Sequence, residues 1–178
     1  GIARFGEGVQ ENPNISFADR DYFPVLRERN NEELWITPPI QGRIYKGWLV
    51  GFVRSYRHPD GRFAGIITAS VPLEHFAELL SQFPVNADDT VVLRHQNLGL
   101  IARYPAKQDS PTGAVGNTQM PADLREHILS GVPQGSFISN TTSDGIKRLI
   151  TYQDLPNAPM VVSVGLSAET FLHDWYTE

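Results

Sequence analysis

One predicted strand carries the side chains best suited to bind a small molecule. Residues 47–57, GWLVGFVRSYR, alternate with a period of two, so every second side chain points to the same face. This face includes three aromatic side chains and one guanidinium: Trp48, Phe52, Arg54 and Tyr56. A guanidinium beside aromatic rings can bind a carboxylate or a phosphate through two parallel hydrogen bonds. The alternative is a structural ion pair of Arg54 with Asp21 or Asp60, because charged side chains are seldom buried without a partner.

Residue types that support metal or nucleophilic chemistry occur without the spacing that this chemistry requires. The chain has no cysteine, and none of its five histidines lies four residues from another. A zinc site needs three or four converging protein ligands. No serine lies in a Gly-x-Ser-x-Gly motif, and the glycine-rich phosphate-binding motifs are missing from the sequence. We therefore expect no metal, no cofactor and no catalytic residue.

The triplet Asp19-Arg20-Asp21 admits two interpretations. Two carboxylates this close in sequence could bind a metal ion or exchange protons with a substrate. The second interpretation is structural, with Asp19 capping the helix that follows and a local ion pair holding the segment. We favour the structural interpretation, because acidic side chains stabilise helix N-termini.

Composition limits the partners of the chain. Its 178 residues carry a formal net charge of −5 at pH 7, and its arginines and lysines are scattered. A nucleic-acid surface needs clustered basic side chains to neutralise phosphates, so we expect no nucleic-acid partner. No segment approaches the roughly 18 consecutive apolar residues of a membrane helix. Contact with a membrane is therefore expected only through flanking spans.

Two segments repeat one pattern. Residues 66–76 read IITASVPLEHF and residues 161–171 read VVSVGLSAETF, so the copies start 95 residues apart. Each begins as an apolar strand and continues into a helix with an acidic residue in its first turn. The spacing is about the length of one small domain. We predict two similar α+β modules in tandem, covering residues 1–84 and 85–178, against the alternative that a common strand-then-helix pattern recurs by coincidence.

Turn signals and periodicity predict the elements of each module. His58-Pro59-Asp60-Gly61 is a tight-turn signal, so the strands on either side should form an antiparallel hairpin. Turns at 143–145 and 156–159 should join three later strands into a meander. The predicted helices are 19–30, 73–83, 121–130 and 168–175, and the predicted strands are 34–37, 47–57, 62–71, 90–94, 98–103, 135–140, 146–153 and 160–166. This order suits antiparallel sheets with helices packed on a face.

Several short motifs give the chain a resemblance to a known sensor family. In the first module they are Asp19-Arg20-Asp21-Tyr22-Phe23, Gly47-Trp48, Arg54 and Asp60-Gly61-Arg62-Phe63-Ala64-Gly65. In the second module they are Ile101-Ala102-Arg103-Tyr104-Pro105, Asp144-Gly145, Arg148 and the stretch VVSVGLS at 161–167. With these motifs the chain resembles the double-Cache sensor domains, which are periplasmic input regions of bacterial membrane receptors. Sensor domains with motifs of this kind look most often like the input regions of diguanylate cyclases.

The resemblance implies a membrane-distal pocket module and a membrane-proximal module. Each is expected to hold a PAS-like antiparallel sheet flanked by helices. The chain departs from the family pattern at its start, because the long leading helix and the first sheet strand are not found. We therefore expect one face of each sheet to lie uncovered, or to be covered by a dimer partner or another chain.

The resemblance also implies ligand-binding residues in the first module. In amino-acid-binding relatives a tyrosine and an arginine on this helical segment hold the ligand. Tyr22 and Arg27 have roughly that spacing, whereas Arg29 stands where the pattern has a tryptophan. The alternative for Tyr22 is plain helix packing. Ser70 stands where those relatives have an aspartate for the ligand amine. This disfavours an α-amino acid and favours an organic acid, or no ligand. The predicted ligand-binding set is Tyr22, Arg27, Trp35, Tyr45, Trp48, Arg54 and Ser70.

We expect the periplasmic, ligand-sensing domain of an inner-membrane signalling protein. It would bind a small molecule, with an anion favoured, and relay the signal to a cytoplasmic output domain such as a diguanylate cyclase. The sensor itself is not expected to be an enzyme. The alternatives are a ligand-free interaction module that forms a homodimer, and a small hydrolase. The hydrolase is disfavoured because no nucleophile–base pair is recognisable.

Overall fold

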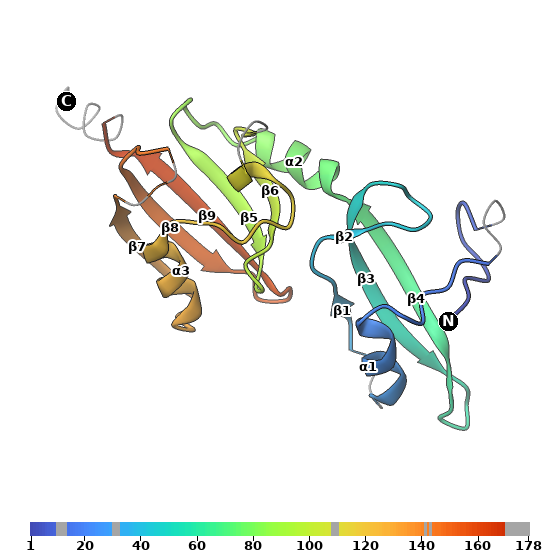
Figure 1. Cartoon of the computed structure of the whole chain (residues 1–178). Coiled ribbons are helices and arrows are strands. Elements are labelled where there is room, and N and C mark those ends of the chain that lie inside the picture. The colour runs from blue at the N-terminus through green and yellow to red at the C-terminus, as the bar shows by residue number, and fades with distance from the viewer. Residues whose placement is uncertain (10–13, 30–32, 108–110, 141, 143, 170–178) are drawn as a thin grey trace. The chain divides into compact units, whose positions relative to one another are not determined.

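The computed structural model describes residues 1–9, 14–29, 33–107, 111–140, 142 and 144–169. Within these ranges the chain is α+β, with two antiparallel sheets and few helices (Figure 1). The chain divides into two compact units, Gly1–Pro72 and Leu73–Glu178. The predicted fold class, two sheet-and-helix modules in tandem, is therefore confirmed. Within the described ranges no helix is long and apolar enough to cross a membrane.

The sheet of the first unit is built around β3 (Trp48–Arg57). β4 (Phe63–Pro72) pairs with β3 antiparallel along its whole length, as the hairpin signal predicts. The other edge of β3 pairs with two short strands, β1 (Trp35–Ile36) and β2 (Ile40–Gln41), of which β2 was not predicted. The prolines at 38–39 separate β1 from β2 because proline has no N–H to donate to the neighbouring strand.

One face of this sheet is covered by α1 (Tyr22–Glu28). The helix and the sheet share a buried apolar cluster, which comprises Tyr22, Phe23, Leu26 and Val53. The ring of Phe23 also meets that of Phe63 edge to face, with the ring centroids 5.8 Å apart. The opposite face exposes large apolar side chains, namely Trp48, Tyr56 and Ile67. α1 thus packs on one face of the first sheet, and the other face exposes these large side chains beside the fully buried Val50.

The second unit holds a five-stranded antiparallel sheet in the order β6-β5-β9-β8-β7. The strands are β5 (Thr90–His95), β6 (Leu100–Tyr104), β7 (Gln134–Ser139), β8 (Arg148–Asp154) and β9 (Met160–Ser167). The last three strands form the predicted meander. β9 then pairs with β5 as well, so the meander and the β5–β6 hairpin join into one sheet.

Three helical segments belong to the second unit. α2 (Leu73–Ser81) follows β4 directly and contacts β6, and η1 (Pro111–Gly113) is a single 3₁₀ turn. α3 (Ala122–Leu129) begins immediately after Pro121, which is its N-cap residue. Gly131 lies two residues beyond the end of the helix and has a φ of 75°. The predicted boundary at 84/85 would place α2 in the first module, and as a functional boundary it stays a prediction. Most of the helix predicted at 168–175 lies outside the described residues.

Candidate functional site

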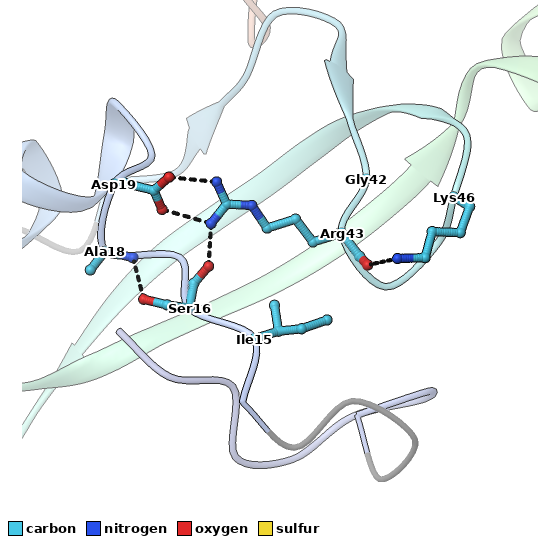
Figure 2. A pocket seen from close by; sticks show the side chains of 7 residues that line it. All are labelled: Ile15, Ser16, Ala18, Asp19, Gly42, Arg43 and Lys46. Atoms are coloured by element: carbon cyan, nitrogen blue, oxygen red, sulfur yellow. Dashed lines mark hydrogen bonds and ion pairs between the residues drawn. The ribbon is translucent and has the colours of Figure 1, made fainter.

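A hollow in the first unit lies between two loops that the helix and the sheet hold in place. The loop before α1 contributes residues 15–19, and the turn between β2 and β3 contributes residues 42–46. The hollow has a volume of about 710 Å³ and is open to solvent. Its lining residues are Ile15, Ser16, Ala18, Asp19, Gly42, Arg43 and Lys46, and we call it the Arg43 hollow (Figure 2).

Two arginines join the loops of the Arg43 hollow. The Nη1 and Nη2 atoms of Arg43 donate to Oδ1 and Oδ2 of Asp19, each at 2.6 Å, and Nη1 also donates to the carbonyl of Ser16. Figure 2 shows this guanidinium reaching from the turn to the opposite loop. Arg20 makes a similar connection, because its Nη2 donates to the carbonyl of Gln41 at 2.6 Å. Charge-assisted hydrogen bonds of this kind are the stronger class in proteins.

Asp19 does not cap α1, so that part of the sequence interpretation is wrong. The residue at the N-cap position is Asp21, which has helical dihedral angles and makes no side-chain capping bond. The carboxylate of Asp19 faces Arg43, a residue 24 positions away, and the ion pair is therefore real but not local. A bidentate guanidinium offers two charged donors, which is more than a single backbone N–H provides. Among the described residues no three His, Asp or Glu side chains gather as a metal site.

The Arg43 hollow carries more positive than negative charge. The hydrogen bonds from Arg43 lower the pKa of Asp19 to about 2, and the same bonds raise the pKa of Arg43, so both groups are charged at neutral pH. Lys46 adds a second cation, and its Nζ donates to the carbonyl of Arg43 at 2.9 Å. That bond uses one of the three N–H donors of the ammonium group. Two cations and one carboxylate thus line the hollow, which favours the approach of small anions.

The depressed pKa of Asp19 predicts that acid loosens the Arg43 hollow. The ordinary pKa of the carboxyl is 3.8, and in the folded chain it is about 2. A group whose pKa falls on folding contributes stability above the unfolded value and loses it as the pH falls through the folded value. We therefore expect the pair to be intact above pH 3.8 and to be lost as the pH falls towards 2. An NMR titration of the Asp19 side chain checks this, and a midpoint that does not rise in the Arg43→Gln variant would contradict it.

Two of the seven predicted ligand-binding residues lie in the core of the first unit. Tyr22 is 5% exposed, and Trp35 packs against the cluster to which Tyr22 belongs. Burial raises the pKa of Tyr22, while the charges of Arg20 and Arg43 act in the opposite direction. The phenol therefore lies within electrostatic reach of both arginines that join the loops. Most of the surface of Tyr22 is therefore buried by helix packing, the alternative that the sequence left open for this residue.

Trp48 and Arg54 lie on the other face of β3. Val53 is fully buried on the side of α1, and successive residues of a strand point to opposite faces. Trp48 is 36% exposed and Arg54 is also exposed. Asp60, one of the expected partners of Arg54, bonds to Nε of Arg62 at 2.7 Å instead. The structure thus places Trp48 and Arg54 on the face opposite α1, and Tyr22 on the α1 side of the sheet.

The other three predicted residues occupy separate positions. Arg27 is exposed on α1. Tyr45 lies in the turn of the Arg43 hollow, with its ring so close to Gly47 that a Cβ atom there would come within 2.5 Å of it. Ser70 is exposed on β4, opposite Gly51 and on the α1 side of the sheet. The part that these residues play in ligand binding stays a prediction.

Sequence reasoning did not single out Arg43 or Lys46. Both lie in a short turn, where strand periodicity carries no information about the direction of a side chain. The available signal was local: two cations sit between Gly42 and Gly47, in a turn that precedes the central strand. Nothing local connects this turn with Asp19, so the pairing itself required the fold.

Solved structures that share this fold include extracellular sensor domains. The extracellular domain of rpHK1S-Z16 matches 90% of this chain and 64% of its own length, with a TM-score of 0.75 and 24% identity. The ligand-binding domain of the Campylobacter jejuni chemoreceptor Tlp3, in complex with L-norvaline, matches 88% of this chain and 55% of its own, with a TM-score of 0.62 and 16% identity. The ligand-binding domain of Mlp24 with asparagine matches 97% and 65%, with a TM-score of 0.61 and 15% identity. The chain spans less than two thirds of each of these solved chains, and at these identities the likeness shows the fold alone.

Comparison by sequence adds the family. No curated protein sequence matches the chain. A family model described as a histidine kinase sensor domain, dCache_1_like, matches residues 73–165. This range holds most of the five-stranded sheet together with α2 and α3, and it is more than half of the 178 residues. The chain therefore belongs to the dCache_1_like family of histidine kinase sensor domains.

Proposed function

We propose that this chain senses a small organic anion in the periplasm and that the anion binds in the Arg43 hollow. Membership of a sensor-domain family supports a role in signalling and not in catalysis. The observation that carries the site is the presence of Arg43 and Lys46 in one solvent-accessible hollow beside Asp19. A ligand carboxylate can bind to the guanidinium beside Asp19, because arginine has five N–H donors and the bonds to Asp19 and Ser16 do not use all of them.

The chemistry of the first unit favours an organic acid over an α-amino acid. Tlp3 and Mlp24 were solved with amino acids bound. An amino acid also needs a carboxylate for its ammonium group, and Asp19 is engaged by Arg43. Ser70, which stands in the predicted place of the amine-binding aspartate, offers only a neutral hydroxyl. A ligand with a carboxylate and no amino group therefore suits the charges that the structure provides.

Thermal-shift titration with succinate, with L-asparagine and with inorganic phosphate tests the Arg43 hollow. We expect succinate to raise the unfolding temperature in a concentration-dependent way. Arg43→Gln should weaken that binding about tenfold or more, because it removes charge-assisted bonds worth roughly 1.5–3 kcal/mol. The matched control is Arg62→Gln, an exposed arginine of the same unit that is also paired with an aspartate. Equal succinate affinity in Arg43→Gln and in the unaltered chain would contradict the assignment.

The bound state would be relayed to a cytoplasmic output domain. The family description supports a histidine kinase as that output, and the sequence motifs propose a diguanylate cyclase as the other choice. A ligand biases the receptor only by its difference in affinity for the two signalling states. Autophosphorylation and cyclic-di-GMP formation, measured on the full-length receptor in membranes with and without succinate, distinguish the two outputs.

A second candidate function is an interaction module that binds no ligand. It is favoured by the face of the first sheet opposite α1, where Trp48, Tyr56 and Ile67 are 36%, 47% and 63% exposed. Large apolar side chains exposed on one sheet face are candidates for a protein contact. Self-association in analytical ultracentrifugation that Ile67→Glu abolishes, together with no thermal shift from any of the three compounds, would favour this function over sensing.

A further inference from the structure

Three arginines of the second unit line one small cavity. The cavity lies between the sheet and the segment that leads into α3, and its volume is about 50 Å³. Its charged lining residues among those described are Arg94, Arg103, Arg148 and Asp144. Its other walls include the hydroxyls of Thr90 and Ser163 and the apolar side chains of Met120, Leu124 and Ile150. The cavity belongs to the second unit alone and is distinct from the Arg43 hollow.

The register of the sheet explains why these side chains meet. Val92 on β5 is paired with Arg103 on β6 and with Ser163 on β9, so all three point to one face. Arg94 follows Val92 by two residues and points to the same face. Arg148 is paired with Ser167, which lies on that face of β9 as well. Three of the five strands, β5, β6 and β8, therefore each deliver one guanidinium group to the side that α3 covers.

Arg148 is the arginine whose charge is balanced. Its Nη1 and Nη2 donate to Oδ1 and Oδ2 of Asp144 at 2.7 and 2.9 Å, and its Nε donates to the carbonyl of Asp88 at 2.7 Å. Burial alone would raise the pKa of Asp144, but the hydrogen bonds and the charge of Arg148 outweigh burial and hold that pKa well below its ordinary value. The pair is therefore fully ionised and cancels its own charge.

Arg94 and Arg103 have no such partner among the described residues. Arg94 is 7% exposed and donates to three backbone carbonyls, those of Leu98, Asn117 and Gln119, at 2.7–2.8 Å. Arg103 comes within 3.9 Å of Asp144, and its Nε is buried with no hydrogen-bond partner in the described part of the chain. The described lining residues thus hold three cations and one carboxylate.

An unbalanced buried cation is costly, and these two arginines show that cost. Burial, and with it the charge of Arg103, lowers the pKa of Arg94 to about 10. Burial also lowers the pKa of Arg103, with Asp144 acting against it and Arg148 adding to it. Buried charges in proteins are usually paired, because an unpaired charge in an apolar setting is strongly unfavourable. A counter-ion from outside the chain would remove the imbalance.

We propose that this cavity binds the carboxylate of a small monocarboxylic acid. Arg103 would supply the hydrogen-bond donor through its unpartnered Nε–H, and Arg94 would supply a second positive charge held rigidly by three carbonyls. Because Asp144 is already paired with Arg148, the positive charges of Arg94 and Arg103 call for an anion. The apolar side chains of Met120 and Leu124 suit a short carbon chain.

The size of the cavity selects short acids. A volume of 50 Å³ corresponds to roughly three to five water molecules at about 10–15 Å³ each. Gly165 contributes to this space, because a Cβ atom there would lie only 2.9 Å from Thr90 Oγ1 and from Arg148 Cδ. An acid with two or three carbon atoms therefore fits, whereas the succinate used for the Arg43 hollow is longer and carries a second charge.

Isothermal titration calorimetry with sodium acetate, with sodium propionate and with inorganic phosphate at constant ionic strength tests this proposal. We expect saturable binding of acetate or propionate. Arg103→Gln should weaken it about tenfold or more. The matched control is Arg125→Gln, an exposed arginine on α3 that does not line the cavity. Succinate binding should be unchanged in Arg103→Gln, and this measurement separates failure of this proposal from failure of the site proposed in the first unit.

The proposal remains testable if Arg103→Gln does not fold. In the unaltered chain the NMR signal of the Arg103 Nε–H should move on addition of acetate and follow the same saturation curve. Arg103→Lys, which keeps the charge without the planar fork, should bind with intermediate affinity. No acetate or propionate binding by the unaltered chain, binding of phosphate alone, or equal affinity in Arg103→Gln would each overturn the proposal.

Discussion

Replacing Tyr152 by alanine should lower the free energy of unfolding of the second unit by about 3–5 kcal/mol. Tyr152 is 1% exposed and is the largest fully buried side chain among the residues that the structure describes. It packs in the cluster of Leu124, Ile150 and Val161 that joins α3 to the sheet. Its ring lies edge to face with those of Phe137 and His127, at centroid distances of 6.5 and 6.0 Å. Truncation therefore removes contacts on all sides and leaves a cavity that the neighbouring strands cannot fill.

Urea denaturation followed by circular dichroism measures this loss. Ile138→Ala is the matched control, because Ile138 lies on the neighbouring β7 and is 58% exposed; its cost should stay below about 1 kcal/mol. Tyr152→Phe keeps the ring and removes only the hydroxyl that donates to the carbonyl of Val132 at 3.3 Å. It should cost about 0.5–1.5 kcal/mol. A Tyr152→Ala loss as small as that of Ile138→Ala would show that the α3 cluster does not hold the second unit together.

Arg148→Met should destabilise the second unit by about 3 kcal/mol, because it leaves the carboxylate of Asp144 without its bidentate partner. The side chain of Arg148 is 5% exposed and that of Asp144 is 22% exposed, so water compensates little. Arg103 lies 3.9 Å from the same carboxylate and replaces only part of the lost interaction. The buried pair therefore contributes mainly by keeping each of its charges from being alone.

A double-mutant cycle separates the pair from its surroundings. Arg148→Met combined with Asp144→Leu should recover part of the lost stability, since the unpaired carboxylate is removed as well. The pH dependence gives a second check. The folded pKa of Asp144 lies below its ordinary value of 3.8, so the pair contributes above that pH and its contribution declines as the pH falls. The stability difference between the unaltered chain and Arg148→Met should shrink in acid, and a constant difference would contradict the role given to the pair.

Local signals in the sequence predicted most of the elements. The tight turn at 58–61 joins two strands that pair along their whole length, and the strands on either side of the turn at 143–145 also pair. β8 alternates between buried and less buried residues, and β9 does so from its second residue. These features depend on interactions between residues close in the chain. The Cache resemblance rested on the same turn and packing residues, and the family comparison supports it.

Local signals did not predict which distant segments pair. β2 is only two residues long, and it forms a strand by pairing with the edge of β3. β5 lies between β6 and β9, and no local pattern specifies that β9 returns along β5. The alternation along β3 predicted that Trp48, Phe52 and Tyr56 share one face of the sheet. Alternation does not specify which element packs on which face, and within this unit α1 packs on the opposite face.

The sequence alone determined the tandem α+β architecture, the turns and the acidic, cysteine-free surface, because these depend on composition and on neighbours in the chain. Only the tertiary structure decided which charges meet. Asp19 finds Arg43 across 24 residues, and three arginines from β5, β6 and β8 share one cavity with Asp144. Their proximity follows from strand register and loop closure, and the energy of a charge depends on which other charges and how much water the fold places around it.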